Sequence, residues 1–361
     1  GYRAEKLAQV STKPILILCY NIVLAAKLNA IMREKEIHHK VNVHHFHDWC
    51  AEQLKTYNIP FPVDKEGTYF EKLVESVIQS VDKNQIPRGQ YEAVMIDEGH
   101  DFHAEWLKLI TQMVDPKTES LLLLYDDAQS IYKSKHTLNF SLSSVGIKAR
   151  GRTTILSINY RNTKEILDLA YKFSRNYIEP HVSGEDGVPI ISPETPEFEA
   201  RKGAYPVLIR KKNWEEEAEY LCKSLRALKT KYKLEWRDIC VIFPRNDIGN
   251  VVKNHMIKNQ LPHSHLVDKK NKKNYDPTQN CINLMTIHSS KGLEFKLVAI
   301  PGIGDMPNKN VDIDSEAKLL YVAMTRSLDM LLLTHSKDSP FTKILYSRIQ
   351  EKIQKDRNEL K

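Results

Sequence analysis

EAVMIDEGHD, residues 92–101, is the stretch from which the fold can be worked out. Its apolar run, residues 93–96, is followed by two adjacent carboxylates, Asp97 and Glu98. A short apolar run between polar residues is typical of a buried β-strand, and this strand would carry both acids at its carboxyl tip. An ordinary strand that ends in a turn has the same pattern, so the stretch alone leaves a structural and a functional interpretation open.

The functional interpretation of this tip is the chemistry of a nucleotide hydrolase, because the tip looks like a Walker B segment. An aspartate after a buried strand can hold a water molecule of Mg²⁺, and we expect Asp97 in that role. The next acid, Glu98, would orient and deprotonate the water that attacks the γ-phosphate of ATP.

Composition and charge limit the class of protein. The 361 residues suffice for two domains, and 41% hydrophobic with 27% charged residues indicates a globular chain. No apolar run approaches the ~20 residues of a membrane span, and no secretory signal opens the chain. The five cysteines are scattered, which predicts reduced thiols in an intracellular, cytoplasmic protein. The net charge of +7 fits a polyanionic partner such as nucleic acid, although many basic proteins have none.

Apolar runs recur along the chain with helical stretches between them. In the first half, strands are expected at residues 14–21, 41–47, 92–97, 121–127 and 153–158. In the second half, strands are expected at residues 206–210, 239–244, 281–287, 296–301 and 330–334. Strands that alternate with helices predict an α/β fold with parallel sheets covered on both faces.

Two further stretches are expected to be loops. Residues 176–205 collect Pro and Gly, which indicates a long loop or linker. Residues 269–273 contain four lysines and indicate a basic surface loop, either a solvated turn or a contact for phosphate.

Five segments stand in a telling order, and two more precede them. The five are the Asp97-Glu98 pair, DDAQSIY at 126–132, NYR at 159–161, TIHSSKGLEF at 286–295 and LYVAMTR at 320–326. Together they resemble motifs II to VI of the superfamily 1 DNA helicases of the UvrD/Rep type. Upstream, LCYN at 18–21 resembles motif Ia, and HFHDWC at 45–50 resembles motif Ib.

This resemblance implies two RecA-like domains of the P-loop NTPase type, which face each other across an ATP cleft. The first would span residues 1–158 and the second residues 159–361, with small accessory insertions. In such helicases, arginines of the facing domain stabilise the γ-phosphate as it leaves, and Arg161 and Arg326 match them. The resemblance also assigns ATP and Mg²⁺ as cofactors, with these remaining nucleotide residues: Gln129 as γ-phosphate sensor, Glu294 on the ribose, Tyr160 on the adenine, and Gly292.

The resemblance further implies a track for single-stranded DNA. Backbone phosphates would meet the motif V side chains Thr286, His288, Ser289 and Lys291. Stacking and polar contacts would come from Tyr20, Asn21, Phe46, His47 and Tyr132. For Phe46 and Trp49, packing in the core is an equal alternative. The cluster of His44, His45, His47 and Cys50 does not have the spacing of a zinc site.

The sequence departs from the family in three places. It contains no G-x-x-x-x-G-K-[ST] P-loop, so we expect the chain to begin just after that loop, to bind ATP poorly and to lack turnover by itself. Ser134 stands where the family has a second stacking aromatic. The spacing between motifs leaves little room for the large duplex-contacting insertion.

Three functional hypotheses remain open at this point. The first is the motor core of an ATP-dependent DNA helicase or translocase, with the 3′-to-5′ polarity that the resemblance implies. The second is a helicase-like scaffold that binds nucleic acid without ATP turnover. The third is the helicase half of a protein with an N-terminal nuclease-related domain or partner, of a kind that includes some phage-defence proteins. The family also includes enzymes of DNA repair.

Overall fold

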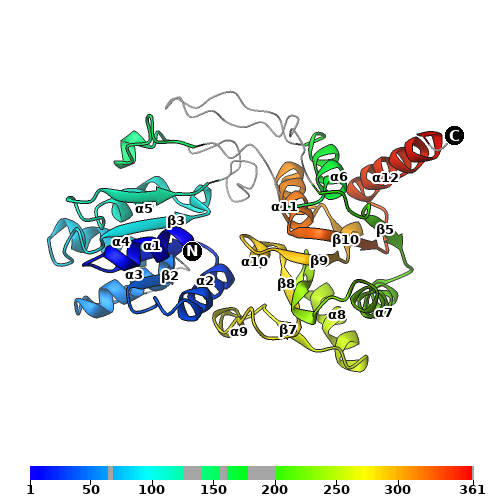
Figure 1. Ribbon diagram of the computed structural model, residues 1–361, viewed down its shortest axis with the longest axis horizontal. Coiled ribbons are helices and arrows are strands. Elements are labelled where there is room, and N and C mark those ends of the chain that lie inside the picture. The colour runs from blue at the N-terminus through cyan, green and yellow to red at the C-terminus, as the bar shows by residue number, and fades with distance from the viewer. Residues whose placement is uncertain (64–67, 126–139, 155–160, 178–200, 360–361) are drawn as a thin grey trace. The chain divides into compact units, whose positions relative to one another are not determined.

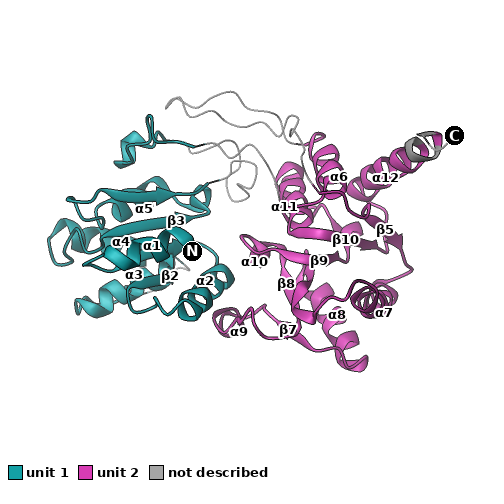
Figure 2. Cartoon of the chain, in the orientation of Figure 1, with its two compact units in different colours: residues 1–154, 183–190 teal, residues 155–182, 191–361 magenta. Residues whose placement is uncertain are grey.

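The computed structural model describes residues 1–63, 68–125, 140–154, 161–177 and 201–359 (Figure 1). The chain divides into two compact units, residues 1–154 with 183–190 and residues 155–182 with 191–361 (Figure 2). The domain boundary predicted after residue 158 falls in a segment outside the described residues, so its position stays a prediction.

Unit 1 is built on a parallel sheet, which in the described part of the chain has the strand order β2-β1-β3-β4. The strands are β1 (Ile15–Cys19), β2 (Val41–His45), β3 (Ala93–Asp97) and β4 (Ser120–Leu123). All five residues of β1 are buried, since a central strand is covered on both faces. The helices are α1 (Tyr2–Val10), α2 (Ile22–Glu34), α3 (Phe46–Thr56), α4 (Tyr69–Asp82) and α5 (Ala104–Thr111). Two short 3₁₀ helices, η1 (Gly99–Asp101) and η3 (Ser143–Val145), complete the unit.

Unit 2 contains a second parallel sheet, with the order β5-β10-β9-β6-β8-β7 among the described strands. The strands are β5 (Val207–Arg210), β6 (Ile239–Phe243), β7 (His263–His265), β8 (Ile282–Thr286), β9 (Phe295–Ile300) and β10 (Ser327–His335). The helices are α6 (Lys164–Ser174), α7 (Trp214–Tyr232), α8 (Asn246–Lys258), α9 (Lys269–Lys273), α10 (Ile287–Ser290), α11 (Ile313–Thr325) and α12 (Pro340–Glu359). The 3₁₀ helices are η4 (Trp236–Asp238) and η5 (Ile303–Asp305).

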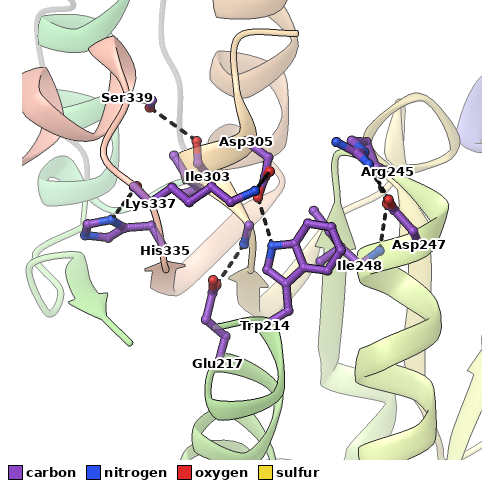
Figure 3. Close-up of polar contacts among 11 residues, drawn as sticks. Trp214, Glu217, Arg245, Asp247, Ile248, Ile303, Asp305, His335, Lys337 and Ser339 are labelled. Carbon is purple, nitrogen blue, oxygen red and sulfur yellow. Dashed lines mark hydrogen bonds and ion pairs between the residues drawn. The ribbon is translucent and has the colours of Figure 1, made fainter. Parts of the chain in front are cut away.

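The carboxyl edge of this second sheet is held by a polar network (Figure 3). Asp305 accepts hydrogen bonds from Trp214 Nε1 and from Lys337 Nζ, both at 2.8 Å. Glu217 is 1% exposed, and its Oε2 accepts from the Gly302 amide at 2.9 Å and from Thr334 Oγ1 at 2.6 Å. These bonds tie the start of α7 to the ends of β9 and β10, so the edge is rigidly joined to a covering helix.

The predicted α/β fold with parallel sheets is confirmed. Strand β7 was not predicted, because its three half-buried residues, His-Ser-His, lack an apolar pattern. Residues 269–273 form the one-turn helix α9, which corrects the expected loop. The predicted strand at residues 153–158 lies mostly outside the described residues. Among the described helices, none combines the length and apolar composition needed to cross a membrane.

Candidate functional site

The two acids of the starting stretch lie at the carboxyl tip of β3, as predicted. β3 pairs with β1 in parallel, and Asp97 lies opposite Cys19. The Glu98 amide donates to Asp97 Oδ1 at 3.0 Å, and Glu98 itself adopts the left-handed conformation with φ of 55°. A residue other than glycine in this conformation costs of order 1–3 kcal/mol and marks a turn that the fold imposes. Burial, and then the charges of Asp97 and Glu98, raise the pKa of the Cys19 thiol.

Two further residues of this tip were missed by sequence reasoning. Helix η1 turns back directly after Glu98 and brings His100 Nε2 to 3.2 Å from Glu98 Oε2 and 3.7 Å from Asp101 Oδ1. His100 is 3% exposed and Asp101 6% exposed. The available signal was the density of three acids and one histidine within five residues.

The chemistry of this tip fits Mg²⁺ held through water. Carboxylate oxygens are the donors that Mg²⁺ accepts, and Mg²⁺ keeps several of its waters in such sites. Within the described ranges, no group of three or more His, Cys, Asp or Glu side chains could hold a metal ion directly. Asp97 is half-buried at the strand tip, so an indirect contact through water is the arrangement that suits it.

In unit 2, two predicted nucleotide residues that lie far apart in sequence form an ion pair. Arg161 Nη1 lies 2.7 Å from Glu294 Oε1. The Arg161 side chain is 72% exposed and the Glu294 side chain 28% exposed. Both groups therefore reach solvent, where a nucleotide could compete for either of them.

The residue after Arg161 fixes this arrangement, and sequence reasoning missed it. Asn162 is 3% exposed, and its Nδ2 donates to the carbonyls of Thr325 at 2.8 Å and Ser327 at 2.6 Å. The Thr163 amide donates to the Leu328 carbonyl at 3.0 Å. The segment that begins at Arg161 is thereby fastened to the end of α11 and the start of β10.

Arg326 lies in the same part of unit 2, between α11 and β10. It is 5% exposed, its Nε donates to the Val322 carbonyl at 3.1 Å, and its Nη1 donates to the Leu293 carbonyl at 3.4 Å. Because Leu293 precedes Glu294, the structure brings the segments of Arg161, Glu294 and Arg326 together. Gly292 begins this turn with φ of 71°, a conformation that glycine adopts without steric cost.

The motif V side chains divide into exposed and buried members. His288 is exposed on α10, whereas Lys291 is 1% exposed. Thr286 Oγ1 lies 3.0 Å from Ser289 Oγ and accepts from the Ser289 amide, so it caps α10. Desolvation lowers the pKa of His288, and the nearby Lys291 and Lys272 lower it further. The expected surface contact of Lys291 with phosphate is corrected, because the structure buries that side chain.

The candidate stacking residues of unit 1 lie in and around an aromatic cluster. Tyr20 stacks on Trp106 with centroids 5.9 Å apart, and its ring also meets His47 at 5.8 Å. Burial, followed by the charge of Asp101, raises the pKa of Tyr20. Phe46 is 0% exposed and stacks on Trp106 at 4.9 Å. The expectation that Phe46 stacks on a base is corrected, because its ring belongs to the core.

The remaining predicted residues have other placements. His47 is 8% exposed, and Trp49, at 1%, is a core residue. Asn21 caps α2, because its Oδ1 accepts from the amides of Val23 at 2.8 Å and Leu24 at 3.3 Å. Three predicted residues lie outside the described part of the chain: Gln129, Tyr132 and Tyr160.

Comparison with known proteins gives a consistent result. ATP-dependent DNA helicase Rep of Buchnera aphidicola is 40% identical over 89 residues, which are 23% of this chain and 13% of Rep. ATP-dependent DNA helicase PcrA of Staphylococcus epidermidis is 33% identical over 85 residues, 21% of this chain and 11% of PcrA. The matches thus span a small part of these relatives. A solved C-terminal domain of a possible DNA helicase from Lactobacillus plantarum aligns with a TM-score of 0.38 at 16% identity, over 52% of this chain and 94% of that one.

The second half of the chain matches a family as a whole. The model of the UvrD-like helicase C-terminal domain matches residues 154–271 and 263–338, which together are more than half of the chain. The segments that carry Arg161, Glu294 and Arg326 all lie inside this match. The chain therefore belongs to the family of UvrD-like helicases.

Proposed function

We propose that this chain is the motor core of an ATP-dependent DNA helicase or translocase that moves along single-stranded DNA in the 3′-to-5′ direction. The observation that carries the proposal is the convergence of the Arg161, Glu294 and Arg326 segments in unit 2. Three segments from distant parts of the chain meet there, and each contributes a side chain that recognises phosphate or ribose.

The acids at the tip of β3 would perform the hydrolytic chemistry. Mg²⁺, when bound, would bridge phosphate oxygens and neutralise charge that develops on them. Asp97 would hold a water of that ion, and Glu98 would orient the attacking water and accept its proton. His100 and Asp101 are positioning residues in this proposal, since His100 lies against the Glu98 carboxylate and is itself buried.

The arginines would stabilise the departing phosphate. A guanidinium placed on a transferring phosphoryl group is typically worth about 10³–10⁵ in rate. Arg161 is exposed and paired with Glu294, so nucleotide binding would exchange that partner for phosphate and leave Glu294 for the ribose. Arg326 is held by main-chain carbonyls close by, which limits the positions its charge can take.

Contacts with DNA would come from both units. In unit 2, His288 and the Thr286–Ser289 hydroxyl pair lie at the carboxyl end of β8 and would meet backbone phosphates. In unit 1, Tyr20 and His47 would supply stacking surfaces that tolerate any base. The net charge of +7 supports a polyanionic substrate.

ATP turnover with and without single-stranded DNA tests the proposal, on the full-length protein. A Glu98→Gln variant is measured beside it, and Glu105→Gln serves as control because Glu105 is an exposed acid of α5 in the same unit. We expect DNA-stimulated turnover that collapses in the Glu98 variant and persists in the control. DNA binding without turnover would overturn the motor and favour the scaffold, whereas equal turnover in the two variants would overturn the role of Glu98.

A further inference from the structure

Helix α9 is the most concentrated positive charge in the described part of unit 2. Its sequence is KKNKK, and with the preceding Asp268 the segment carries four positive charges against one negative. Lys269, Lys270 and Lys273 are exposed, and Lys272 is half-buried. A solvated turn needs no such density, so the orientation of the lysines decides whether the segment forms a surface.

The lysines of α9 all lie on one side of the helix. At 100° per residue, Lys269, Lys270, Lys272 and Lys273 fall within an arc of about 160°, and Asn271 points away from them. Asn271 Nδ2 donates to the His265 carbonyl at 3.1 Å, so the side opposite the lysines faces the end of β7. The single-sided distribution therefore turns the lysines away from the sheet.

The helix is also fixed at both ends. Asp268 caps its start, because Asp268 Oδ1 accepts from the Asn271 amide at 2.8 Å and Oδ2 accepts from Asn271 Nδ2 at 2.6 Å. Two residues beyond its end, Tyr275 is 9% exposed and packed in the core, and burial raises the pKa of its hydroxyl. An anchored helix presents its charges at defined positions and loses less entropy on binding than a flexible loop.

The position of α9 places these lysines beside motif V. Strands β7 and β8 are parallel neighbours in register His263–Ile282 to His265–Leu284. Because α9 follows β7 and α10 follows β8, both helices lie at the same edge of the sheet. Lys272 is close enough to His288 to lower its pKa. The basic helix and the exposed imidazole therefore form one continuous surface within unit 2.

We propose that α9 together with His288 binds successive phosphates of the single-stranded DNA backbone, as an extension of the track that motif V begins. This inference rests on the proposed function and assigns it a second phosphate-binding element. The side chains of α9 are lysine and asparagine only, without an aromatic or apolar group. Such a surface recognises phosphate charge and is indifferent to base sequence.

The test compares two double variants of the full-length protein for binding of a fluorescent oligothymidylate without ATP. Lys270→Ala with Lys273→Ala removes two exposed charges of α9. Lys231→Ala with Lys258→Ala is the control, because these exposed lysines end α7 and α8, at the opposite, amino edge of the same sheet. Lys270→Arg with Lys273→Arg keeps the charge.

Each phosphate contact contributes about 0.7 to the slope of log affinity against log salt for a single strand. Two lost contacts make this slope less negative by about 1.4 and weaken binding by about 25-fold at about 0.1 M salt. We expect this change in the α9 alanine variant and neither in the control nor in the arginine variant. An α9 alanine variant that matches the control, while the unmodified protein binds DNA, overturns this inference alone. Absence of oligothymidylate binding by the unmodified protein overturns this inference and the DNA contacts of the proposed function together.

Discussion

Replacement of Asn162 by alanine should destabilise unit 2 far more than replacement of its neighbour Arg161. The Asn162 side chain is 3% exposed and donates to two main-chain carbonyls, at 2.8 and 2.6 Å. A buried acceptor that loses its donor costs about 1–3 kcal/mol, so the loss of both bonds should lower the free energy of unfolding by about 2–4 kcal/mol. The ion pair of Arg161 with Glu294 is exposed, and its loss should change that free energy by less than about 1 kcal/mol.

Urea unfolding followed by circular dichroism measures the free energy of unfolding for both variants. Amide hydrogen exchange then locates the loss, which should appear in α11 and β10, while β1 and β3 of unit 1 serve as internal reference. An Asn162→Asp variant keeps the size but replaces the donor by an oxygen, and it should be at least as unstable as the alanine variant. If the Asn162 and Arg161 alanine variants agreed within about 0.5 kcal/mol, the clamping role of Asn162 would be refuted.

Three other predictions follow from the described contacts. Arg161→Ala should reduce ATP turnover by about 10³–10⁵ while the protein stays folded, and turnover within tenfold of the unmodified protein would contradict its phosphate role. His288 has a lowered pKa, so its contribution to stability is present above about pH 6.5 and is lost as the pH falls through its folded-state pKa. An NMR titration should show a small upward shift of the His288 pKa in Lys272→Ala, and no shift would argue against their proximity. Phe46→Ala should cost about 3–5 kcal/mol as a core deletion, whereas Phe46→Leu should retain affinity for single-stranded DNA, unless the ring stacks on a base after all.

Sequence by itself determined the architecture and the positions of most candidate side chains. Apolar runs between helical stretches predict parallel sheets, since a strand covered on both faces has no polar alternation. Asp97 and Thr286 follow such runs directly, so their places at the carboxyl ends of β3 and β8 required no tertiary information. The resemblance carried by Arg161, Glu294 and Arg326 agrees with the family match.

Tertiary structure alone decided which of these side chains meet and which are buried. Asn162 clamps two segments more than 160 positions away, and no local pattern in the sequence indicates such a contact. Lys291 and Phe46 are buried because of what packs around them, which depends on segments distant in sequence. Helix α9 faces outward because Asn271 reaches a carbonyl on β7, a strand that carries no apolar pattern. Local order follows from hydrophobic periodicity and capping, whereas burial and partner choice depend on the whole chain.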